Sequence, residues 1–246
     1  MSSIPKIYLN KSFIQNEKVI IDGDNFHHLK NVLRLSIGDK IIVSDMENND
    51  YTCRIINVNN IIWAEIIDHK ISETEFPFSV CLFQAFAKGD KMETIVQKAT
   101  ELGVTDIYPV YMDRCVSKPD EKSINNKINR YQKIALNASS QSGRGKIPKV
   151  HDPIKYIEAV KKLSNYDIGF ICYEGENTTP IKEILSSKKS ELKSIGFLIG
   201  PEGGISEKEC IMSLENNVGL VGLGKRILRT ETASSFVLSA ISVIFC

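Results

Sequence analysis

Two glycine-containing segments near the C-terminus carry the residue types that bind a small ligand through backbone groups. The first, GPEGG at residues 200–204, directly follows an apolar run and directly precedes a helix start. The second begins at Gly222 and reads GLGKRILRTETAS. Glycine allows a positive φ and a close approach of the backbone to a ligand, and a helix start offers unpaired N–H groups. Ligand binding at GPEGG is therefore one interpretation, and a tight turn without a ligand is the other.

Nucleotide-binding motifs can be tested against these glycines. A dinucleotide-binding fold requires G-x-G-x-x-G and an acidic residue about 20 positions later, and neither is present. Gly219, Gly224 and Lys225 satisfy the G-x-x-x-x-G-K part of a phosphate-binding loop, but Arg226 stands where Ser or Thr must bind Mg²⁺. A nucleotide-hydrolysing enzyme is therefore disfavoured. What remains is one pocket built largely from backbone, which suits an adenosine-like ligand better than a triphosphate.

Apolar runs alternate with helical patterns through the C-terminal part of the chain. Strands are expected at residues 79–87, 105–112, 167–173, 194–200 and 218–223. Helices are expected at residues 91–102 and 123–142, from Asp152 and Pro153, from a capping box of Ser206 and Glu209, and from about Thr232. This alternation predicts an α/β fold with a mostly parallel sheet, whose ligands bind outside the carboxyl ends of the strands.

The N-terminal part of the chain has a different pattern. Residues 1–72 contain short runs rich in β-branched and aromatic residues, separated by turn-rich pieces, with one helical pattern at residues 25–35. This pattern predicts a small all-β unit with Trp63 in its core. The polar segment ISETEFP then ends in Pro77. We therefore expect two domains, residues 1–72 and residues 76–246.

Composition and targeting signals point to a soluble cytoplasmic protein. The 246 residues are 42% apolar and 25% charged, with a net charge of +1. The opening residues lack the apolar core of a signal peptide, and the apolar run at residues 236–246 is too short to span a bilayer. The six cysteines do not have the spacing of a zinc site. We expect buried thiols, no metal and no membrane partner.

Several motifs in combination resemble a known family. FLIGPEGGISEKE followed by GLGKRILRTETASSFVLSAI resembles the S-adenosylmethionine site of the knotted (SPOUT-class) methyltransferases. Within that class, the motifs resemble in particular the bacterial enzymes that methylate N3 of a uridine in small-subunit (16S) ribosomal RNA. KGDKMETIVQKATELGVTDIYPV, DRCVSK and IALNASSQSGRGKIPKV resemble other blocks of that family, and FHHLKNVLRLSIGDKI resembles its N-terminal PUA-like β-barrel, which binds RNA. The resemblance covers nearly the whole chain.

The resemblance implies a fold, a cofactor and partners. It implies a C-terminal chain threaded into a trefoil knot, a bent S-adenosylmethionine within it, and a homodimer with its sites near the subunit interface. It also implies that the substrate is small-subunit ribosomal RNA or a ribosomal subunit. Carried over residue by residue, the cofactor-binding residues are Leu198, Gly200, Gly203, Leu223, Gly224, Ile227, Leu228 and Arg229.

The charge distribution indicates an RNA partner independently. Between Arg114 and Lys149 there are nine basic residues against two acidic ones, so this segment carries +7 and the rest of the chain −6. A surface that binds the phosphates of RNA needs its positive charge gathered in one region in this way. A solvent-exposed helix face also explains a run of lysines. Lys6 stands where the family usually has arginine. The RNA-binding candidates are Lys6, His28, Arg34, Lys118, Arg130 and Lys146.

Uridine N3 carries a proton and becomes nucleophilic when that proton is lost, which places negative charge on the flanking carbonyl oxygens. A nearby cation stabilises that charge. Our catalytic candidates are Arg144 first and Arg114 second, with Glu202 or Glu231 as bases or hydrogen-bond orienters. Arg144 lies between two glycines, which predicts a mobile loop suited equally to gripping a phosphate. The remaining alternatives are a catalytically silent RNA-binding ribosome-assembly factor and a methyltransferase acting on a different RNA nucleotide.

Overall fold

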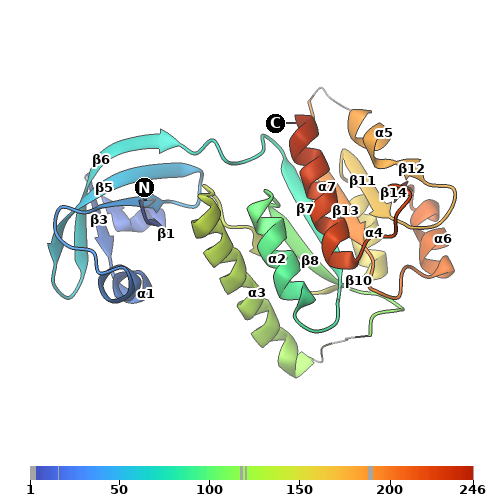
Figure 1. Cartoon of the computed structure of the whole chain (residues 1–246), viewed down its shortest axis with the longest axis horizontal. Coiled ribbons are helices and arrows are strands. Elements are labelled where there is room, and N and C mark those ends of the chain that lie inside the picture. The colour runs from blue at the N-terminus through green and yellow to red at the C-terminus, as the bar shows by residue number, and fades with distance from the viewer. Residues whose placement is uncertain (1–3, 16, 117–118, 120, 188–190, 246) are drawn as a thin grey trace. The chain divides into compact units, whose positions relative to one another are not determined.

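The computed structural model describes residues 4–15, 17–116, 119, 121–187 and 191–245. The chain forms two compact units (Figure 1). The N-terminal unit comprises Met1–Glu75 and Ser139–Ile147, and the C-terminal unit comprises Phe76–Ala138 and Pro148–Cys246. The sequence pattern gives no sign that Ser139–Ile147 belongs with the first unit, because this segment ends a long helix and contains no strand pattern.

The N-terminal unit is a six-stranded sheet in the order β1-β4-β5-β6-β3-β2. All of its described strand pairs are antiparallel except β1 with β4. The strands are β1 (Lys6–Tyr8), β2 (Ile14–Gln15), β3 (Lys18–Ile21), β4 (Lys40–Ser44), β5 (Asn49–Val58) and β6 (Ile62–Ile71). Three short helices complete it: η1 (Lys11–Phe13), α1 (Gly23–His27) and the π-helical η2 (His28–Val32). The predicted β unit is confirmed; its expected helical segment at residues 25–35 is the consecutive pair α1 and η2, and the short η1 was not expected from the sequence.

Side chains of this sheet alternate between the core and the opposite face. Cys53 and Ile55 of β5 and Ile62 and Ala64 of β6 are fully buried. Trp63 lies between two of these core positions and is only partly buried, because successive side chains of a strand point to opposite faces. The expectation that Trp63 belongs to the core was therefore wrong.

The C-terminal unit is an eight-stranded sheet in which every described strand pair is parallel. Its order is β10-β8-β7-β13-β11-β14-β12, with β9 also paired to β8. The strands are β7 (Ser79–Ala85), β8 (Asp106–Tyr111), β9 (Lys149–Val150), β10 (Ile154–Lys155), β11 (Ile168–Cys172), β12 (Thr179–Pro180), β13 (Ser194–Ile199) and β14 (Gly219–Gly222). The predicted parallel α/β fold is confirmed, and the trefoil knot remains an expectation from the resemblance.

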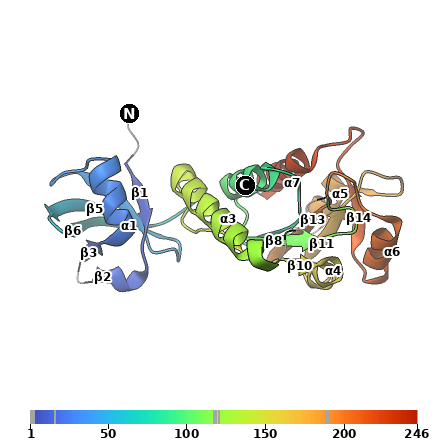
Figure 2. The same cartoon turned by 90° about the horizontal axis from the view of Figure 1, so that it is seen from below.

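Helices cover both faces of this parallel sheet. Figure 2 shows α2 (Lys91–Glu101) and α7 (Thr230–Phe245) on one face and α4 (Tyr156–Leu163) on the other. The remaining helices are α3 (Glu121–Ser142), α5 (Ile181–Ser186) and α6 (Glu207–Glu215). Buried residues of α4 pack with Phe83, Ile171 and Leu198 of the sheet into one apolar core. Burying both faces explains why the strands read as nearly continuous apolar runs.

The first residues of three helices can be compared with the starts predicted from the sequence. The capping box at α6 is confirmed, since Ser206 and Glu209 each bond to the other's backbone N–H. The start predicted at Asp152 and Pro153 was wrong, because Ile154 and Lys155 pair with β8 as a short strand and delay α4 to Tyr156. The last helix begins at Thr230, two residues earlier than expected.

The five cysteines among the described residues are all buried thiols, as expected; Cys246 lies outside that part of the chain. Burial raises the pKa of the Cys53 thiol to about 12, so this thiol stays protonated near neutral pH. Within the described residues, no helix combines the length and the apolar character that a membrane span requires.

Gly169 of β11 is a position of close backbone approach. A Cβ added there would lie 2.0 Å from the carbonyl oxygen of Leu163, whereas a Cβ at Gly219 of the neighbouring β14 would meet no atom within 4 Å. We predict that Gly169→Ala lowers the free energy of unfolding by about 1–3 kcal/mol, and that the matched Gly219→Ala changes it by less than about 0.5 kcal/mol. Urea unfolding followed by circular dichroism measures both. Equal effects would contradict this packing.

Candidate cofactor pocket and RNA-binding residues

A pocket of about 400 Å³ opens at the carboxyl ends of β11, β13 and β14. The two glycine segments singled out from the sequence both contribute to it. It is lined by Lys91, Cys172, Tyr173, Glu174, Ile199, Gly200, Pro201, Glu202, Gly204, Leu223, Gly224, Lys225, Arg226, Ile227, Leu228, Arg229, Thr230 and Ala233. One ligand in this pocket would contact both segments, as a doubly covered parallel sheet allows at its carboxyl edge.

The hydroxyl of Thr230 ties three elements together at the base of this pocket. Its Oγ1 donates to the carbonyl oxygen of Gly200 at 2.9 Å and accepts from Nε2 of Gln84, also at 2.9 Å. Gln84 is fully buried in β7, and Thr230 begins α7. The GPEGG segment is further closed by a bond from the Gly204 N–H to the Pro201 carbonyl, with Gly204 at a φ of +72°. The pocket wall is therefore held in place by hydrogen bonds to backbone.

Most of the cofactor-binding residues expected from the sequence line this pocket. These are Gly200, Leu223, Gly224, Ile227, Leu228 and Arg229. Leu198 and Gly203 lie outside the lining: Leu198 is fully buried in the sheet core, and a Cβ on Gly203 would meet Arg114 at 3.0 Å. Their contact with a cofactor stays a prediction, and the geometry gives both a packing role.

Arg114 makes a hydrogen bond to the GPEGG segment. Its Nη1 donates to the carbonyl oxygen of Gly203 at 3.1 Å. A Cβ on Gly204 would lie 2.5 Å from a carboxylate oxygen of Glu174. Arg114, the second cation expected from the sequence, therefore lies against this segment but is not part of the pocket lining.

The carboxylates of Glu202 and Glu231 meet at Lys91. The Lys91 Nζ lies 3.0 Å from Glu202 Oε1 and 3.8 Å from Glu231 Oε2. Glu202 Oε1 also accepts from the backbone N–H of Lys88 at 3.0 Å. Burial alone raises the pKa of Glu202, but its bonds from Lys91 and backbone N–H groups outweigh burial and lower it. Glu202 therefore stays ionised and bound, which suits an orienting role better than that of a base.

Lys91 was not identified from the sequence. It lies within the block KGDKMETIV that supports the resemblance, but its spacing to Glu202 and Glu231 along the chain carries no signal. The parallel sheet brings the three together because α2 and α7 cover the same face.

Arg144 is held in the N-terminal unit by a buried ion pair. Its guanidinium donates to both carboxylate oxygens of Glu75, and both side chains are less than a tenth exposed. Burial raises the pKa of Glu75. The hydrogen bonds and charge of Arg144, together with the N–H groups of Lys146 and Gly145, outweigh burial, so the pKa is lowered overall. The guanidinium is thus committed to Glu75 and does not project from a mobile loop.

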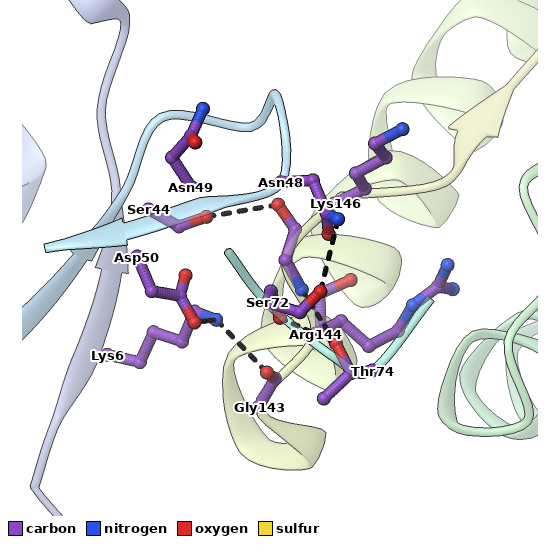
Figure 3. A network of polar contacts seen from close by, with 12 residues as sticks. Lys6, Ser44, Asn48, Asn49, Asp50, Ser72, Thr74, Gly143, Arg144 and Lys146 are labelled. Atoms are coloured by element: carbon purple, nitrogen blue, oxygen red, sulfur yellow. Dashed lines mark hydrogen bonds and ion pairs between the residues drawn. The ribbon is translucent and has the colours of Figure 1, made fainter. Parts of the chain in front are cut away.

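The backbone around Arg144 is fixed as well (Figure 3). Lys6 Nζ bonds to Asp50 at 2.8 Å and to the carbonyl oxygen of Gly143 at 3.0 Å. The hydroxyl of Tyr8 donates to the Arg144 carbonyl, and that of Ser44 donates to the Gly145 carbonyl. The expectation of a mobile loop from the two glycines was therefore wrong, because hydrogen bonds hold the backbone of residues 143–145 in place. The buried Lys6 makes one of these bonds.

The other RNA-binding candidates differ in exposure. His28, Arg34 and Lys146 are exposed, Arg130 pairs with Glu93 at the surface, and Lys118 lies outside the described residues. His27 is also exposed, so neither adjacent histidine faces the core; Leu29 does. In the described part of the chain, no three His, Cys, Asp or Glu side chains come together as a metal site would require.

Comparison with known proteins agrees with this arrangement. The RNA methyltransferase domain family matches residues 74–242, and the RNA methyltransferase PUA domain family matches residues 21–62. Ribosomal RNA small subunit methyltransferase E of Bacillus subtilis (strain 168) is 34% identical over 226 residues, which cover 90% of this chain and 88% of that protein. The chain belongs to the ribosomal RNA small subunit methyltransferase E family. The resemblance identified from the sequence is confirmed.

Two solved structures of similar proteins cover nearly the whole chain. Ribosomal RNA small subunit methyltransferase E from Neisseria gonorrhoeae, bound to S-adenosyl methionine, has 31% identity and a TM-score of 0.87 over 99% of this chain and 98% of that one. A methyltransferase from Legionella pneumophila, in complex with the bound cofactor SAM, has 26% identity and a TM-score of 0.86, with 98% of each chain covered. Both units of the chain are therefore typical of this family.

The buried pair predicts the stability of Arg144 variants. Arg144→Ala leaves the Glu75 charge buried without its partner, so we expect a loss of about 3–5 kcal/mol in the free energy of unfolding. The matched Arg130→Ala breaks an exposed pair and should cost about 1 kcal/mol or less. Chemical denaturation at neutral pH measures both.

The pH dependence of the same variant has a definite sign. Because the folded-state pKa of Glu75 is lowered, the stability from its ionised form is complete above its unfolded-state pKa and is lost as pH falls through the folded-state value. The difference between wild type and Arg144→Ala should therefore be largest near neutral pH and shrink in acid. A difference that grows in acid would contradict the pairing.

Proposed function

We propose that this protein transfers a methyl group from S-adenosylmethionine to N3 of a specific uridine in small-subunit (16S) ribosomal RNA. The observation that supports this most is a single pocket formed by GPEGG and by the segment from Leu223 to Thr230. Its relatives in Bacillus and Neisseria are named as ribosomal RNA small subunit methyltransferases, and the Neisseria protein binds S-adenosyl methionine. We propose the same cofactor and the same class of substrate here.

The pocket residues fit this cofactor. Its size falls within the range of about 300–1,000 Å³ typical of small-molecule sites, and apolar side chains from Leu223, Leu228 and Ala233 suit an adenine ring. Backbone groups at Gly200 and Gly224 are accessible because glycine leaves no Cβ in the way. The amino-acid part of the cofactor carries a positive ammonium group and a negative carboxylate group. Lining residues of both signs, Lys91, Glu202 and Arg229, suit these two groups. When bound, the cofactor supplies an activated methyl group.

The protein must then supply alignment, proton removal and charge stabilisation. Arg144 and Arg114 are engaged with Glu75 and with the Gly203 carbonyl, so we assign them positioning roles. Arg226 and Arg229 line the pocket itself, and we assign to them the stabilisation of negative charge on the uracil carbonyl oxygens. N3 lies on the base-pairing edge, so the target uridine is unpaired or flipped out when it reacts.

The substrate and the assembly follow from this proposal. A ribosomal RNA substrate places the enzyme in the cytoplasm. The N-terminal unit is proposed to position the RNA, with His28, Arg34 and Lys146 as exposed contacts. We propose a homodimer, as the family resemblance implies. Ribosomal RNA from cells lacking the protein should lack one N3-methylated uridine, and an unchanged set of methylated nucleosides would contradict the proposed reaction.

A charge in the apolar wall tests the cofactor assignment. Leu223→Asp places a carboxylate where an apolar ligand surface would lie, so we predict that affinity for S-adenosylmethionine falls about tenfold or more. The matched Leu214→Asp, at a residue 56% exposed on α6 and outside the pocket lining, should leave affinity unchanged. Isothermal calorimetry of folded variants measures both. Unchanged affinity of Leu223→Asp for S-adenosylmethionine would show that Leu223 does not contact the cofactor.

Charge removal tests the RNA assignment. Replacing His28, Arg34 and Lys146 together by alanine should weaken RNA binding and lower the salt slope of the affinity, by about 0.7 for each lost phosphate contact. Binding of S-adenosylmethionine should not change, since these residues lie outside the pocket lining. The control replaces the exposed Lys161, Lys182 and Lys208 of the C-terminal unit. A larger loss in the control would place RNA binding there instead.

A further inference from the structure

Lys91 is the first residue of α2 and bridges two carboxylates beside the pocket. Its Nζ lies 3.0 Å from Glu202 Oε1 and 3.8 Å from Glu231 Oε2, and all three side chains are only partly exposed. Lys91 and Glu202 line the pocket, as do Thr230 and Ala233 on the same turn of α7 as Glu231. Glu231 itself is not among the lining residues; its carboxylate lies next to the pocket, beside Lys91.

The carboxylates of Glu202 and Glu231 differ in their hydrogen-bond partners. Glu202 Oε1 accepts from both the Lys88 N–H and Lys91 Nζ. Glu231 Oε2 is buried and has no hydrogen-bond partner among the described residues, because the 3.8 Å to Lys91 exceeds hydrogen-bonding distance. A buried acceptor left unsatisfied is costly. An atom of this kind beside a ligand pocket can take the missing donor from a bound molecule.

We propose that Glu231 Oε2 accepts an N–H group of a bound ligand, and that Lys91 is the residue that positions it. This rests on the proposed function, which offers two N–H donors: the amino group of S-adenosylmethionine and N3–H of the target uridine. The inference also separates the two glutamates, since Glu202 already has its partners and Glu231 does not. Glu202 holds the GPEGG segment, and Glu231 contacts the ligand.

If the donor is uridine N3–H, the contact has a chemical consequence. The N3 proton moves to Glu231 Oε2, and N3 keeps the electron pair of the broken N–H bond. N3 then bonds to the methyl carbon as the carbon–sulfur bond breaks, and that bond's electron pair goes to sulfur. The products are N3-methyluridine, a neutral thioether and a protonated Glu231, which releases its proton to solvent.

Lys91 matters because it separates two like charges. Besides Lys91 and Glu202, the charged groups around the pocket are Glu174, Lys225, Arg226 and Arg229. Without Lys91, the carboxylates of Glu202 and Glu231 lose the cation that lies within 3.8 Å of both. Arginine at position 91 keeps the charge, so Lys91→Arg should rescue what Lys91→Met loses.

The experiment measures cofactor binding and methyl transfer separately. Wild-type protein is first tested for S-adenosylmethionine binding by calorimetry and for single-turnover transfer to small-subunit ribosomal RNA at saturating RNA. Failure of wild type in both measurements contradicts the proposed function itself. Glu231→Gln, Lys91→Met and Lys91→Arg are then compared with the exposed control Glu183→Gln on α5, which should match wild type.

Glu231→Gln decides which donor the carboxylate accepts. A tenfold or larger loss of cofactor affinity without RNA assigns Oε2 to the cofactor's amino group. Normal affinity with a transfer rate reduced about 10²-fold or more assigns it to uridine N3–H. Either result supports the proposal. A Glu231→Gln variant within threefold of wild type in both measurements overturns it.

Lys91→Met tests the positioning role. The quantity that Glu231→Gln lowers, affinity or transfer rate, should also fall in Lys91→Met and return in Lys91→Arg. In the Glu231→Gln background, Lys91→Met should lower that quantity no further, because the carboxylate that Lys91 positions is already gone. An equal further loss in that background, or no loss in Lys91→Met alone, would show that Lys91 does not position Glu231.

Discussion

The hydroxyl group of Thr230 is the contact on which the pocket depends. It accepts from the buried Gln84 of β7 and donates to the Gly200 carbonyl at the end of β13, while its own residue starts α7. One side chain thus joins a central strand, the GPEGG segment and the helix that follows the second glycine segment. A buried hydrogen-bond chain of this kind holds backbone at fixed distances. A cofactor site made mostly of backbone needs that rigidity, because backbone groups cannot adjust as side-chain rotamers do.

Buried charges show how the same chain uses arginine and lysine for structure. Arg144 with Glu75 and Lys6 with Asp50 are both ion pairs with little exposure. Around them, backbone carbonyls of Gly143, Arg144 and Gly145 accept from Lys6, Tyr8 and Ser44. A buried pair is costly to break because it leaves one charge without compensation. Part of the basic excess between residues 114 and 149 therefore fixes the fold, and only the exposed remainder is available to RNA.

Local patterns predicted the fold well where each element carries its own signal. The apolar runs of the parallel sheet, the capping box at Ser206 and the strand–glycine–helix order at GPEGG are all local, and the structure agrees with them. Long-range contacts were not predictable in the same way. Glu75 lies 69 residues from Arg144, and Glu202 lies 111 residues from Lys91, so no spacing indicates either pair. Glycines flanking Arg144 predicted mobility, because the sequence does not show which carbonyl groups become hydrogen-bonded.

The central claim is that the two glycine segments form one S-adenosylmethionine site, and hydrogen exchange tests it directly. Amide exchange of the wild-type protein is measured by mass spectrometry with and without S-adenosylmethionine. Both the peptide containing Gly200–Gly204 and the peptide containing Leu223–Arg229 should become protected on addition of the cofactor, over the same concentration range. Protection of only one segment, or protection confined to the N-terminal unit, would contradict a shared site at the carboxyl edge of the sheet.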